Sequence, residues 1–545
     1  MKMRKVLVLT GGGFHDFKHC GEILEQFLLK AGDMKVAHTE DRSALNKENL
    51  QKFDALLVFT QGDGLTAKQV KDLQAWVQAG GALVGIHCAS DSFRNHPAFV
   101  SLLGSEFAGH GPVHSFEVAP CCGDHYITRR MQPFTIEDEL YLLKGDSTRW
   151  TTLATSSWNF KSQPMLYVRE EEKGRIAYIA LGHGEAAFRH PEFQKIVIRS
   201  LRWATGAKES APIRCGVIGY GGAFNMGKIH GEAMAGVPGL EFTAVCDADP
   251  NRTEAARQDF PDIQTYNSVK KMVADKNLDL VVLVTPHNTH AELGIQAARG
   301  GKHVITEKPM CITAQEATAM IDAASKSKVM LSVFHNRRWD GDYMALRKLV
   351  AEGMIGEVFQ VELFGGGYSH PGWWWRANKA ISGGCLYDWG AHFVDWILNL
   401  IPSPVESVYG SFQKKQWHGV TNEDHTVAMI RFRNGALATA EISSLAALPK
   451  DRWRVLGSKG AVSMHDYPDG AWTVSSYSGG SQIQGKVPFL KGDWHAYYRN
   501  IADHLTLGEE LAVKAEEGRR VIAVIETAEK SSKAGKSLPV PYEEA

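Results

Sequence analysis

Hydrophobic residues along the first segment of the chain form short unbroken runs that alternate with amphipathic stretches. The runs at 5–10, 55–60 and 82–86 are apolar almost throughout, which predicts strands buried on both faces. Helical spacing follows them at 18–30 and 67–79. Such alternation favours a parallel sheet with helices on both faces, whose ligand site lies at the carboxyl ends of the strands.

A short polar linker at 205–212 separates this segment from a second series of buried strands. These strands are predicted at 213–219, 241–246, 279–285 and 303–306. Later runs, at 357–364, 426–432 and 436–443, read as strands by alternation and β-branched content. We therefore expect three domains, at 1–207, 208–333 and 334–545.

One predicted helix combines an apolar face with ionisable side chains. It follows Gly383-Gly384, and its positions Asp388, His392 and Asp395 fall at i, i+4 and i+7 on one face. Both a carboxylate and an imidazole carry protons, so the pair suits general acid/base work. The structural alternative is that the Asp388–His392 pair only stabilises one turn of the helix.

Composition narrows the class of protein. Hydrophobic residues make up 44% and charged residues 22%, the formal charge is −1, and the pI is about 7.1. Nothing in these values favours nucleic acid or a membrane surface, so we expect a small-molecule substrate. The apolar run near the N-terminus is too short for a signal peptide, and eight scattered cysteines suggest reduced thiols in a cytoplasmic protein.

Histidines recur at the predicted strand ends of the first segment, and Glu139 lies in a Glu-Asp-Glu-Leu-Tyr stretch. The candidate second site comprises His15, Asp16, His87, His110, His114, Glu139 and His183. Its residue types favour a sugar-binding or acid/base pocket. Divalent metal binding is an alternative that we do not favour, because no local spacing matches a zinc motif.

The Gly-Gly-Phe-His-Asp turn at 12–16, the Gly-Ile-His at 85–87 and the Leu-Gly-His at 181–183 resemble ThuA-like (trehalose-utilisation) proteins. That resemblance covers most of residues 4–206 and implies a flavodoxin-like, glutamine amidotransferase-like fold. His87 stands where a glutaminase has its nucleophilic cysteine, and Cys88 is one residue late. We therefore exclude glutamine hydrolysis, which needs a thiol in direct reach of its base.

A glycine-rich turn follows the strand at 213–219 and precedes a helix, as in a dinucleotide-binding unit. It is not a clean GxGxxG: Phe224 occupies the last glycine position and Gly227 comes late, which indicates an insertion. Asp247 ends the next strand and is placed to accept hydrogen bonds from the adenosine ribose. The Asp247 carboxylate would repel the extra phosphate of NADP, so we predict NAD. Arg252 nearby offsets part of that repulsion.

The Thr-Pro-His-Asn series at 285–288 and the Glu-Lys-Pro at 307–309 resemble the Gfo/Idh/MocA oxidoreductases, from about residue 213 to the end. The resemblance implies a Rossmann domain, then an α+β domain with an open, mostly antiparallel sheet that forms dimers or tetramers. It assigns catalysis to Lys308, Asp388 and His392. The expected cofactor-binding residues are Gly219, Gly221, Gly222, Ala223, Phe224, Asp247, Thr285, Pro286, Asn288, His290 and Glu307.

Aromatic and basic residues near the predicted catalytic helix suggest a sugar-binding wall. If residues 373–375 form an extended strand, their three tryptophans alternate sides, so at least one lines a cleft while others pack in the core. The candidate substrate contacts are His335, Arg337, Trp374, Trp375, Arg376, Asp395 and His495.

Three functions are compatible with these residues. The first is NAD-dependent oxidation of a secondary hydroxyl of a sugar or glycoside, at C3, with the first domain acting on or binding the sugar or keto-sugar. The second is NAD-dependent glycoside cleavage, since a C3 ketone acidifies the C2 hydrogen and its loss expels the C1 group. The third makes the first domain only a regulatory sugar-binding module.

Overall fold

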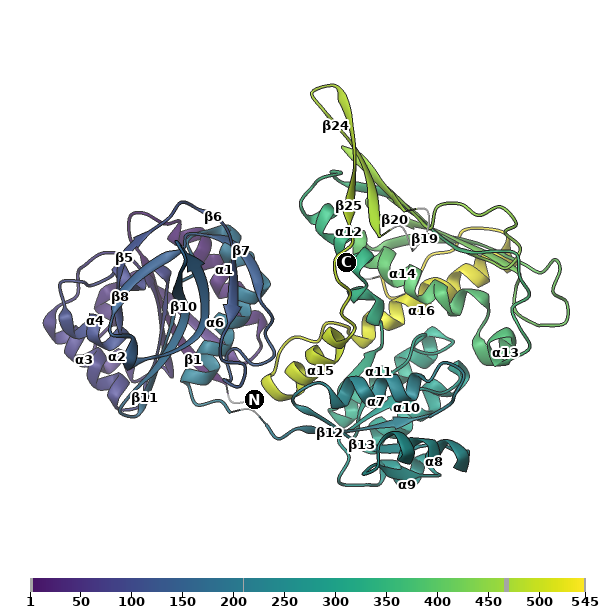
Figure 1. Ribbon diagram of the computed structural model, residues 1–545, viewed down its shortest axis with the longest axis horizontal. Helices are drawn as coiled ribbons and strands as arrows, with labels where there is room; N and C mark the ends of the chain where they lie inside the picture. Colours follow the sequence, from purple (N-terminus) through teal and green to yellow (C-terminus); the bar gives the residue numbers. More distant parts are fainter. Residues whose placement is uncertain (1–2, 209, 465–469, 544–545) are drawn as a thin grey trace. The chain divides into compact units, whose positions relative to one another are not determined.

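The computed structural model describes residues 3–208, 210–464 and 470–543. The chain divides into two compact units, residues 1–210 and 211–545 (Figure 1). Each unit has its own large hydrophobic core.

The first unit is built on a nine-stranded sheet with the order β2-β1-β3-β4-β11-β10-β9-β6-β7. Neighbours from β2 to β11 pair in parallel, and the remaining neighbours pair antiparallel. The strands are β1 (Arg4–Gly11), β2 (Met34–Thr39), β3 (Ala55–Thr60), β4 (Ala82–Ile86), β6 (His114–Pro120), β7 (Phe134–Asp138), β9 (Thr151–Trp158), β10 (Lys161–Glu171) and β11 (Gly174–Ile179). The prediction of a parallel sheet therefore holds for only part of this unit.

Helices cover both faces of that sheet, as the sequence predicts (Figure 1). They are α1 (Phe17–Lys30), α2 (Lys47–Leu50), α3 (Ala67–Gln78), α4 (Pro97–Leu103), α5 (Glu185–Arg189) and α6 (Pro191–Ala204). A two-stranded sheet, β5 (Ser105–His110) with β8 (Tyr141–Gly145), lies beside them. Strands β1, β3, β4 and β11 are neighbours, so the loops that follow them meet at one edge of the sheet.

The second unit begins with a six-stranded parallel sheet in the order β14-β13-β12-β15-β16-β17. This is the strand order of a Rossmann fold. The strands are β12 (Ile213–Ile218), β13 (Leu240–Cys246), β14 (Gln264–Tyr266), β15 (Leu280–Leu283), β16 (His303–Thr306) and β17 (Leu331–Val333). Its helices are α7 (Met226–Ala235), α8 (Pro250–Asp259), α9 (Val269–Val273), α10 (His290–Arg299) and α11 (Ala314–Ser327).

An eight-stranded sheet follows, in the order β19-β20-β21-β18-β22-β23-β24-β25, and only β18 and β21 pair in parallel among its described strands. Its strands are β18 (Val358–Gly366), β19 (Val405–Gln413), β20 (His425–Phe432), β21 (Leu437–Ser443), β22 (Trp453–Gly457), β23 (Gly460–Met464), β24 (Ala471–Ser478) and β25 (Ser481–Pro488). The associated helices are α12 (Gly341–Ala351), α13 (Lys379–Ser382), α14 (Trp389–Leu400), α15 (His495–Leu507) and α16 (Ala515–Ala534). The expected open, mostly antiparallel sheet is confirmed.

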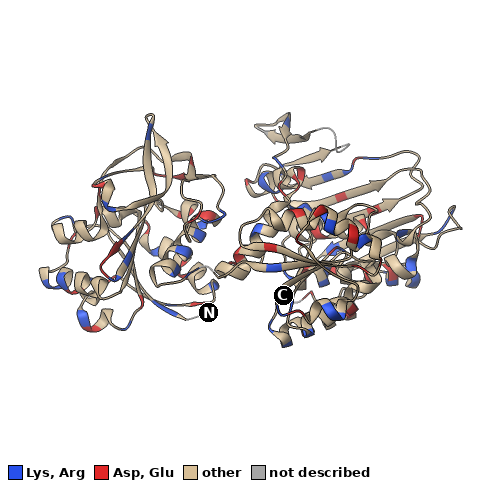
Figure 2. Ribbon diagram, turned by 60° about the horizontal axis from the view of Figure 1, so that its bottom comes forward, with Lys and Arg blue, Asp and Glu red and all other residues tan. Residues whose placement is uncertain are grey.

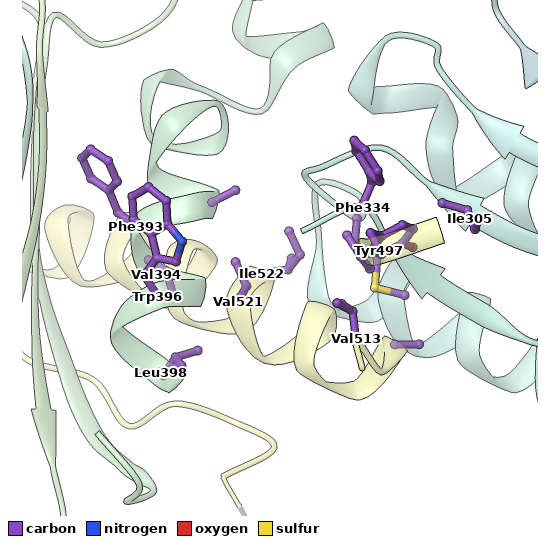
Figure 3. Packing of buried hydrophobic residues seen from close by; sticks show 14 of the residues in the cluster. Ile305, Phe334, Phe393, Val394, Trp396, Leu398, Tyr497, Val513, Val521 and Ile522 are labelled. Carbon is purple, nitrogen blue, oxygen red and sulfur yellow. The ribbon is translucent and has the colours of Figure 1, made fainter. Parts of the chain in front are cut away.

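One continuous hydrophobic core joins the two sheets of the second unit. In Figure 3, Phe393 and Trp396 of α14 lie near Val521 and Ile522 of α16, while Phe334 and Tyr497 occupy the side nearer the Rossmann sheet. Helix α14 is buried on almost all sides, including its ionisable residues His392 and Asp395. Each fully buried large apolar side chain contributes roughly 1.5–3 kcal/mol. The core thereby fixes α14, and the ionisable residues on it, against the nucleotide-binding sheet.

Charged residues of both signs are mixed along the elements of both units (Figure 2). All eight cysteines lie within the described ranges and are unpaired. Among the described residues, no helix combines the length and the apolar character that crossing a membrane requires.

Candidate active sites

The glycine-rich turn after β12 has the backbone that a bound pyrophosphate needs. Gly219 has a φ of +102°, and a Cβ there would lie 2.3 Å from the Val284 carbonyl oxygen. Gly221 faces open space, and Asn225 supplies no side-chain cap to α7. The first N–H groups of α7 are therefore left for an anion.

Gly227 explains why the turn departs from the usual spacing. A Cβ at this position would lie 2.8 Å from the Gly219 carbonyl oxygen, so the glycine permits α7 to pack closely on the turn. This close packing is the task of the last glycine in a regular fingerprint. Phe224, at the position where the regular fingerprint has its last glycine, has a side chain that is 55% exposed.

Asp247 and Arg252 lie beside that turn. The Asp247 carboxylate accepts hydrogen bonds from the Tyr220 N–H at 2.7 Å and the Asp249 N–H at 2.9 Å. A carboxylate has about four acceptor sites, so it retains capacity for ribose hydroxyls. The Arg252 guanidinium approaches Gly222, since a Cβ added there would lie 2.5 Å from its Nη1.

The other predicted cofactor residues occupy the loops after β15 and β16. Both ring nitrogens of the buried His290 lie 2.9 Å from carbonyl oxygens, those of Thr285 and Pro309. Asn288 is exposed. His290 therefore ties the two loops together, and Asn288 is left facing solvent. The Lys308–Pro309 peptide is cis.

Glu307 is held by a histidine that the sequence did not indicate. The buried His230 contacts Glu307 at 3.1 Å through Nε2 and the Tyr498 hydroxyl at 2.6 Å through Nδ1. Burial by itself raises the pKa of Glu307, but His230 and the Lys308 charge bring it below its ordinary value. No motif in the sequence marks His230 on α7. Its contact with Glu307 and Tyr498 becomes visible only because α15 packs against α7.

Lys308 and Asp388 meet, although they are far apart in the sequence. The Lys308 ammonium lies 2.7 Å from Asp388 Oδ1, and the Arg376 guanidinium lies 2.6 Å from the same oxygen. Burial alone would raise the pKa of Asp388, but Lys308 and Arg376 hold it well below its usual range. Asp388 is therefore a carboxylate between two cations, and it pairs with Lys308 and Arg376 rather than with His392.

His392 lies one turn into α14, which begins at Trp389 with Asp388 as its N-cap. Its side chain is 4% exposed, and the ring of the buried His335 is 6.3 Å away. Burial, followed by the charge of Lys308, lowers the pKa of His392 well below its ordinary value. The imidazole is consequently neutral at neutral pH and able to accept a proton.

Arg376 is surrounded by aromatic rings. Its guanidinium lies 5.1 Å from the Phe224 ring centre, 5.4 Å from Trp374 and 5.0 Å from Trp375. Phe224 belongs to the cofactor turn, so this cluster connects the expected cofactor site to the expected substrate wall. Stacked cation–π contacts of this kind stabilise a fixed guanidinium orientation.

The predicted core packing of neighbouring tryptophans is wrong. Residues 373–374 are not in a strand, and Trp375 begins a 3-10 helix (Trp375–Ala377). Trp373 is 76% exposed, Trp374 is 36% exposed, and Trp375 is half-buried. Glycines and a proline before this stretch let the chain leave the sheet, so no pleat alternates the rings.

Three further candidates have partners other than Lys308 and Asp388, or are exposed. Asp395 is buried and paired with Arg338 at 2.5 Å, which leaves it facing the core rather than a ligand. The Arg337 guanidinium lies over the rings of Trp389 (4.5 Å) and Trp494 (5.3 Å). His495 is exposed at the start of α15.

In the first unit the structure brings three predicted histidines together. His15 follows β1, His87 follows β4 and His183 follows β11; a nitrogen of each lies within 4.8 Å of the others. Burial and the two neighbouring imidazoles lower the pKa of His15 to about 4. This is a compact group of imidazoles at the carboxyl edge of the sheet.

Glu139 faces these histidines from the loop between β7 and β8. Its Oε2 lies 3.0 Å from His183 Nδ1 and 3.5 Å from His87 Nε2, and its Oε1 lies 3.3 Å from His110 Nδ1. Asp138 beside it accepts from the backbone N–H groups of Gly182 and His183, which positions the His183 loop. The sequence analysis did not assign Asp138 a role, although it adjoins Glu139.

Two predicted members do not join the cluster. Asp16 accepts from the His19 N–H and caps α1. The half-buried His114 contacts its own turn through the Pro112 carbonyl oxygen, 2.8 Å from Nδ1, and packs on Trp158. Both residues have structural contacts that their place in the sequence did not reveal.

Comparison with known proteins identifies the class. A family model described as "Trehalose utilisation" (ThuA) matches residues 5–204. A model described as "Oxidoreductase family, NAD-binding Rossmann fold" matches residues 213–335, and one described as "GFO/IDH/MocA C-terminal domain" matches residues 343–463. The chain belongs to the Gfo/Idh/MocA oxidoreductases and carries a ThuA-family domain at its N-terminal end.

Individual relatives resemble the oxidoreductase part. The D-glucoside 3-dehydrogenase of Escherichia coli (strain K12) is 30% identical over 44% of this chain and 72% of that enzyme. The scyllo-inositol 2-dehydrogenase (NADP(+)) IolW of Bacillus subtilis (strain 168) is 28% identical over 62% of this chain and 98% of that enzyme. The crystal structure of an NAD-binding protein from Listeria innocua is 30% identical with a TM-score of 0.55, covering 61% of this chain and 98% of that one.

Proposed function

We propose that the second unit oxidises a secondary hydroxyl of a sugar or related polyol and delivers the hydride to a nicotinamide cofactor. The contact between Lys308 and Asp388 carries this proposal, because it joins the loop after β16 to the start of α14. His392 lies one turn further along α14 and is under the influence of the Lys308 charge, which supports placing a proton acceptor and a fixed cation in one site. The two named relatives above act on a glucoside and on an inositol, which supports a polyhydroxy substrate.

The residues divide the work according to charge. His392 is neutral and accepts the hydroxyl proton, while the Lys308 ammonium donates a hydrogen bond to the same oxygen as negative charge develops. Asp388 holds Lys308 in place, and Arg376 holds Asp388. The bound nicotinamide would supply the hydride acceptor.

Position C3 of a glucoside is the proposed site of oxidation, by analogy with the D-glucoside 3-dehydrogenase relative. A panel of glucosides, their 3-deoxy analogues and inositols, assayed for NADH formation with purified protein, tests this assignment. We expect turnover with glucosides and none with the 3-deoxy compounds. Turnover of 3-deoxy substrates would contradict C3 oxidation and leave the oxidoreductase class intact.

We propose NAD as the cofactor because Asp247 directly follows β13 beside the glycine turn, where a carboxylate repels a 2′-phosphate. Arg252 beside Gly222 is the opposing feature, and the relative IolW is named as NADP-dependent. Measuring KM for both cofactors with one substrate tests the proposal. A lower KM for NADP than for NAD would overturn it.

Glycoside cleavage with no net redox change is a second candidate, favoured by the separate polar site in the first unit. In this scheme the keto-sugar made by the second unit loses its C2 proton and expels the C1 substituent, water then adds at C1, and the NADH formed in the first step reduces the C3 ketone back to the alcohol. Incubation of an aryl glycoside with NAD distinguishes the two functions. Release of the phenol without accumulating NADH indicates cleavage, and accumulating NADH indicates the dehydrogenase.

We also propose that the outer face of the eight-stranded sheet binds a second copy of the chain. Tyr409 of β19 and Met429 of β20 are cross-strand partners and are 44% and 45% exposed, and Leu437 of β21 is 39% exposed. Solution mass measured by light scattering should exceed that of one chain. Met429→Glu should lower it, while Lys348→Glu on the exposed face of α12 should not.

A further inference from the structure

The histidine cluster of the first unit has the features of a metal centre. We propose that His15, His87 and His183 bind one divalent transition-metal ion, and that Glu139 lies beside the coordination position they leave open. The proposal concerns the first unit alone and does not depend on the reaction assigned to the second.

Hydrogen bonds already fix the tautomers that a metal requires. The His87 Nδ1–H donates to the Ala180 carbonyl oxygen at 2.8 Å, and the His15 Nδ1–H donates to the His183 carbonyl oxygen at 3.2 Å. Metal-binding histidines characteristically donate their second ring N–H in this way. Each of these two rings therefore directs its Nε2 lone pair away from the backbone.

His87 supplies the strongest indication of a missing ligand. Its side chain is fully buried, and its Nε2 has no hydrogen-bond partner, although Glu139 lies 3.5 Å away. Its φ is +45°, a conformation that non-glycine residues seldom adopt. A strained backbone that presents an unpartnered buried nitrogen is unfavourable unless something binds that nitrogen.

Geometry and donor type indicate the class of ion. The three ligand nitrogens lie within 4.8 Å of one another. Zinc binds histidine at about 2.0–2.1 Å, so modest side-chain rotation brings all three nitrogens onto one ion. Imidazole donors favour Zn²⁺, Co²⁺ or Ni²⁺ over Mg²⁺ or Ca²⁺, which prefer oxygen.

Three histidines leave a tetrahedral ion one open position, as in catalytic zinc sites. Glu139 is outside the group of three but within 3.0 Å of His183 Nδ1. It is placed to accept a proton from a metal-bound water, which would become hydroxide. The oxygen of a small carbonyl or hydroxyl compound is the class of ligand that this open position would take.

The test uses the full-length protein, stripped with a chelator and titrated with Zn²⁺ and with Co²⁺. We expect one ion per chain by elemental analysis, and visible absorption of Co²⁺ at the intensity typical of tetrahedral sites. His183→Ala and His15→Ala should weaken Zn²⁺ by more than the roughly 10–100-fold that loss of an outer partner produces, and Glu139→Gln by no more than that. His114→Ala, a histidine outside the cluster, should leave affinity unchanged.

Hydrogen–deuterium exchange in residues 1–210 serves as the folding control, because the first unit has its own core and must itself be shown to stay folded in each variant. His87→Ala is avoided, since its buried strained position makes misfolding the expected result. Two results would overturn the proposal. One is wild-type protein that binds no more metal than the His15→Ala/His183→Ala double variant. The other is stoichiometric metal that survives both substitutions.

Discussion

The two candidate sites occupy the same topological position and have opposite electrostatic character. Each lies where the loops at the carboxyl ends of parallel strands meet. In the first unit one carboxylate, Glu139, faces three imidazole rings. In the second unit one carboxylate, Asp388, forms ion pairs with both Lys308 and Arg376.

This difference shows how a similar sheet edge is adapted to different ligands. Lone pairs that converge without a nearby cation suit a positively charged ligand, which supports a metal in the first unit. A fixed ammonium beside a neutral imidazole suits an oxygen that is losing its proton, which supports the redox site in the second. Function follows from the loop residues rather than from the fold.

The largest predicted effect separates the two sites by activity. Lys308→Met should reduce kcat/KM for the oxidation by about 10³–10⁴-fold, because it removes the cation next to the reacting oxygen. NADH binding, measured by fluorescence, and Zn²⁺ binding by the first unit should both be unchanged. The exposed Lys348→Met is the matched control. Near-normal turnover in Lys308→Met would end the assignment.

The second prediction separates the units by stability. Trp396 is 1% exposed and packs on Trp453 and Tyr343. Trp396→Ala should lower the free energy of unfolding by about 3–5 kcal/mol. Hydrogen–deuterium exchange should show faster exchange in residues 211–545 and no change in residues 1–210. Equal acceleration in both units would contradict their separate cores.

The third prediction concerns acid. Burial, followed by His290, lowers the pKa of His287 to about 3. Since the unfolded chain then binds more protons, this histidine lowers stability as pH falls from about 6.5 toward 3. The loss should be roughly 2 kcal/mol between about pH 7 and pH 4.5. His287→Gln should make urea unfolding of the second unit less pH-dependent, and an unaltered pH dependence would refute the prediction.

The fourth prediction examines the cofactor turn. Arg252→Ala should raise KM for NADP about tenfold, equivalent to about 1.4 kcal/mol, and leave KM for NAD nearly unchanged. The reason is that the guanidinium lies against Gly222, near the expected site of the 2′-phosphate. Initial-rate kinetics with both cofactors measure this effect. Equal increases in KM for the two cofactors would show that Arg252 does not bind the 2′-phosphate.

The smallest predicted effect provides a contrast with Trp396. Trp373 is 76% exposed, so Trp373→Ala should change the free energy of unfolding by no more than about 0.5 kcal/mol. Any change should instead appear in KM for the sugar. A large loss of stability would mean that Trp373 packs more tightly than its exposure indicates.

The fold was predictable where burial leaves a simple pattern. The runs at 55–60 and 82–86 match β3 and β4 at both ends, since strands covered on both faces are apolar throughout. The antiparallel strands β9 and β10 were not predicted. Their sequences include Thr, Ser, Gln and Glu, so they lack the unbroken apolar run by which the other strands were predicted.

The sites were predictable in residue type but not in partnership. Lys308 and Asp388, two of the residues predicted to act together, are in contact, yet the pairing of Asp388 with Arg376 was not foreseen. Asp388 and Asp395 look alike in sequence, but Asp395 forms an ion pair with Arg338 in the core. Which cation reaches which carboxylate depends on contacts between distant segments, and local spacing carries no information about them.

The sequence by itself determined the positions of the buried parallel strands, the chemical groups that follow them and the family of each half. Tertiary structure alone decided that His15, His87 and His183 converge while His114 does not. The physical reason is that strand order sets which loops become neighbours, and that order is fixed by packing across the whole sheet. Histidines that look alike in the sequence therefore have different roles. Three of them form a candidate metal centre, and His114 makes structural contacts elsewhere.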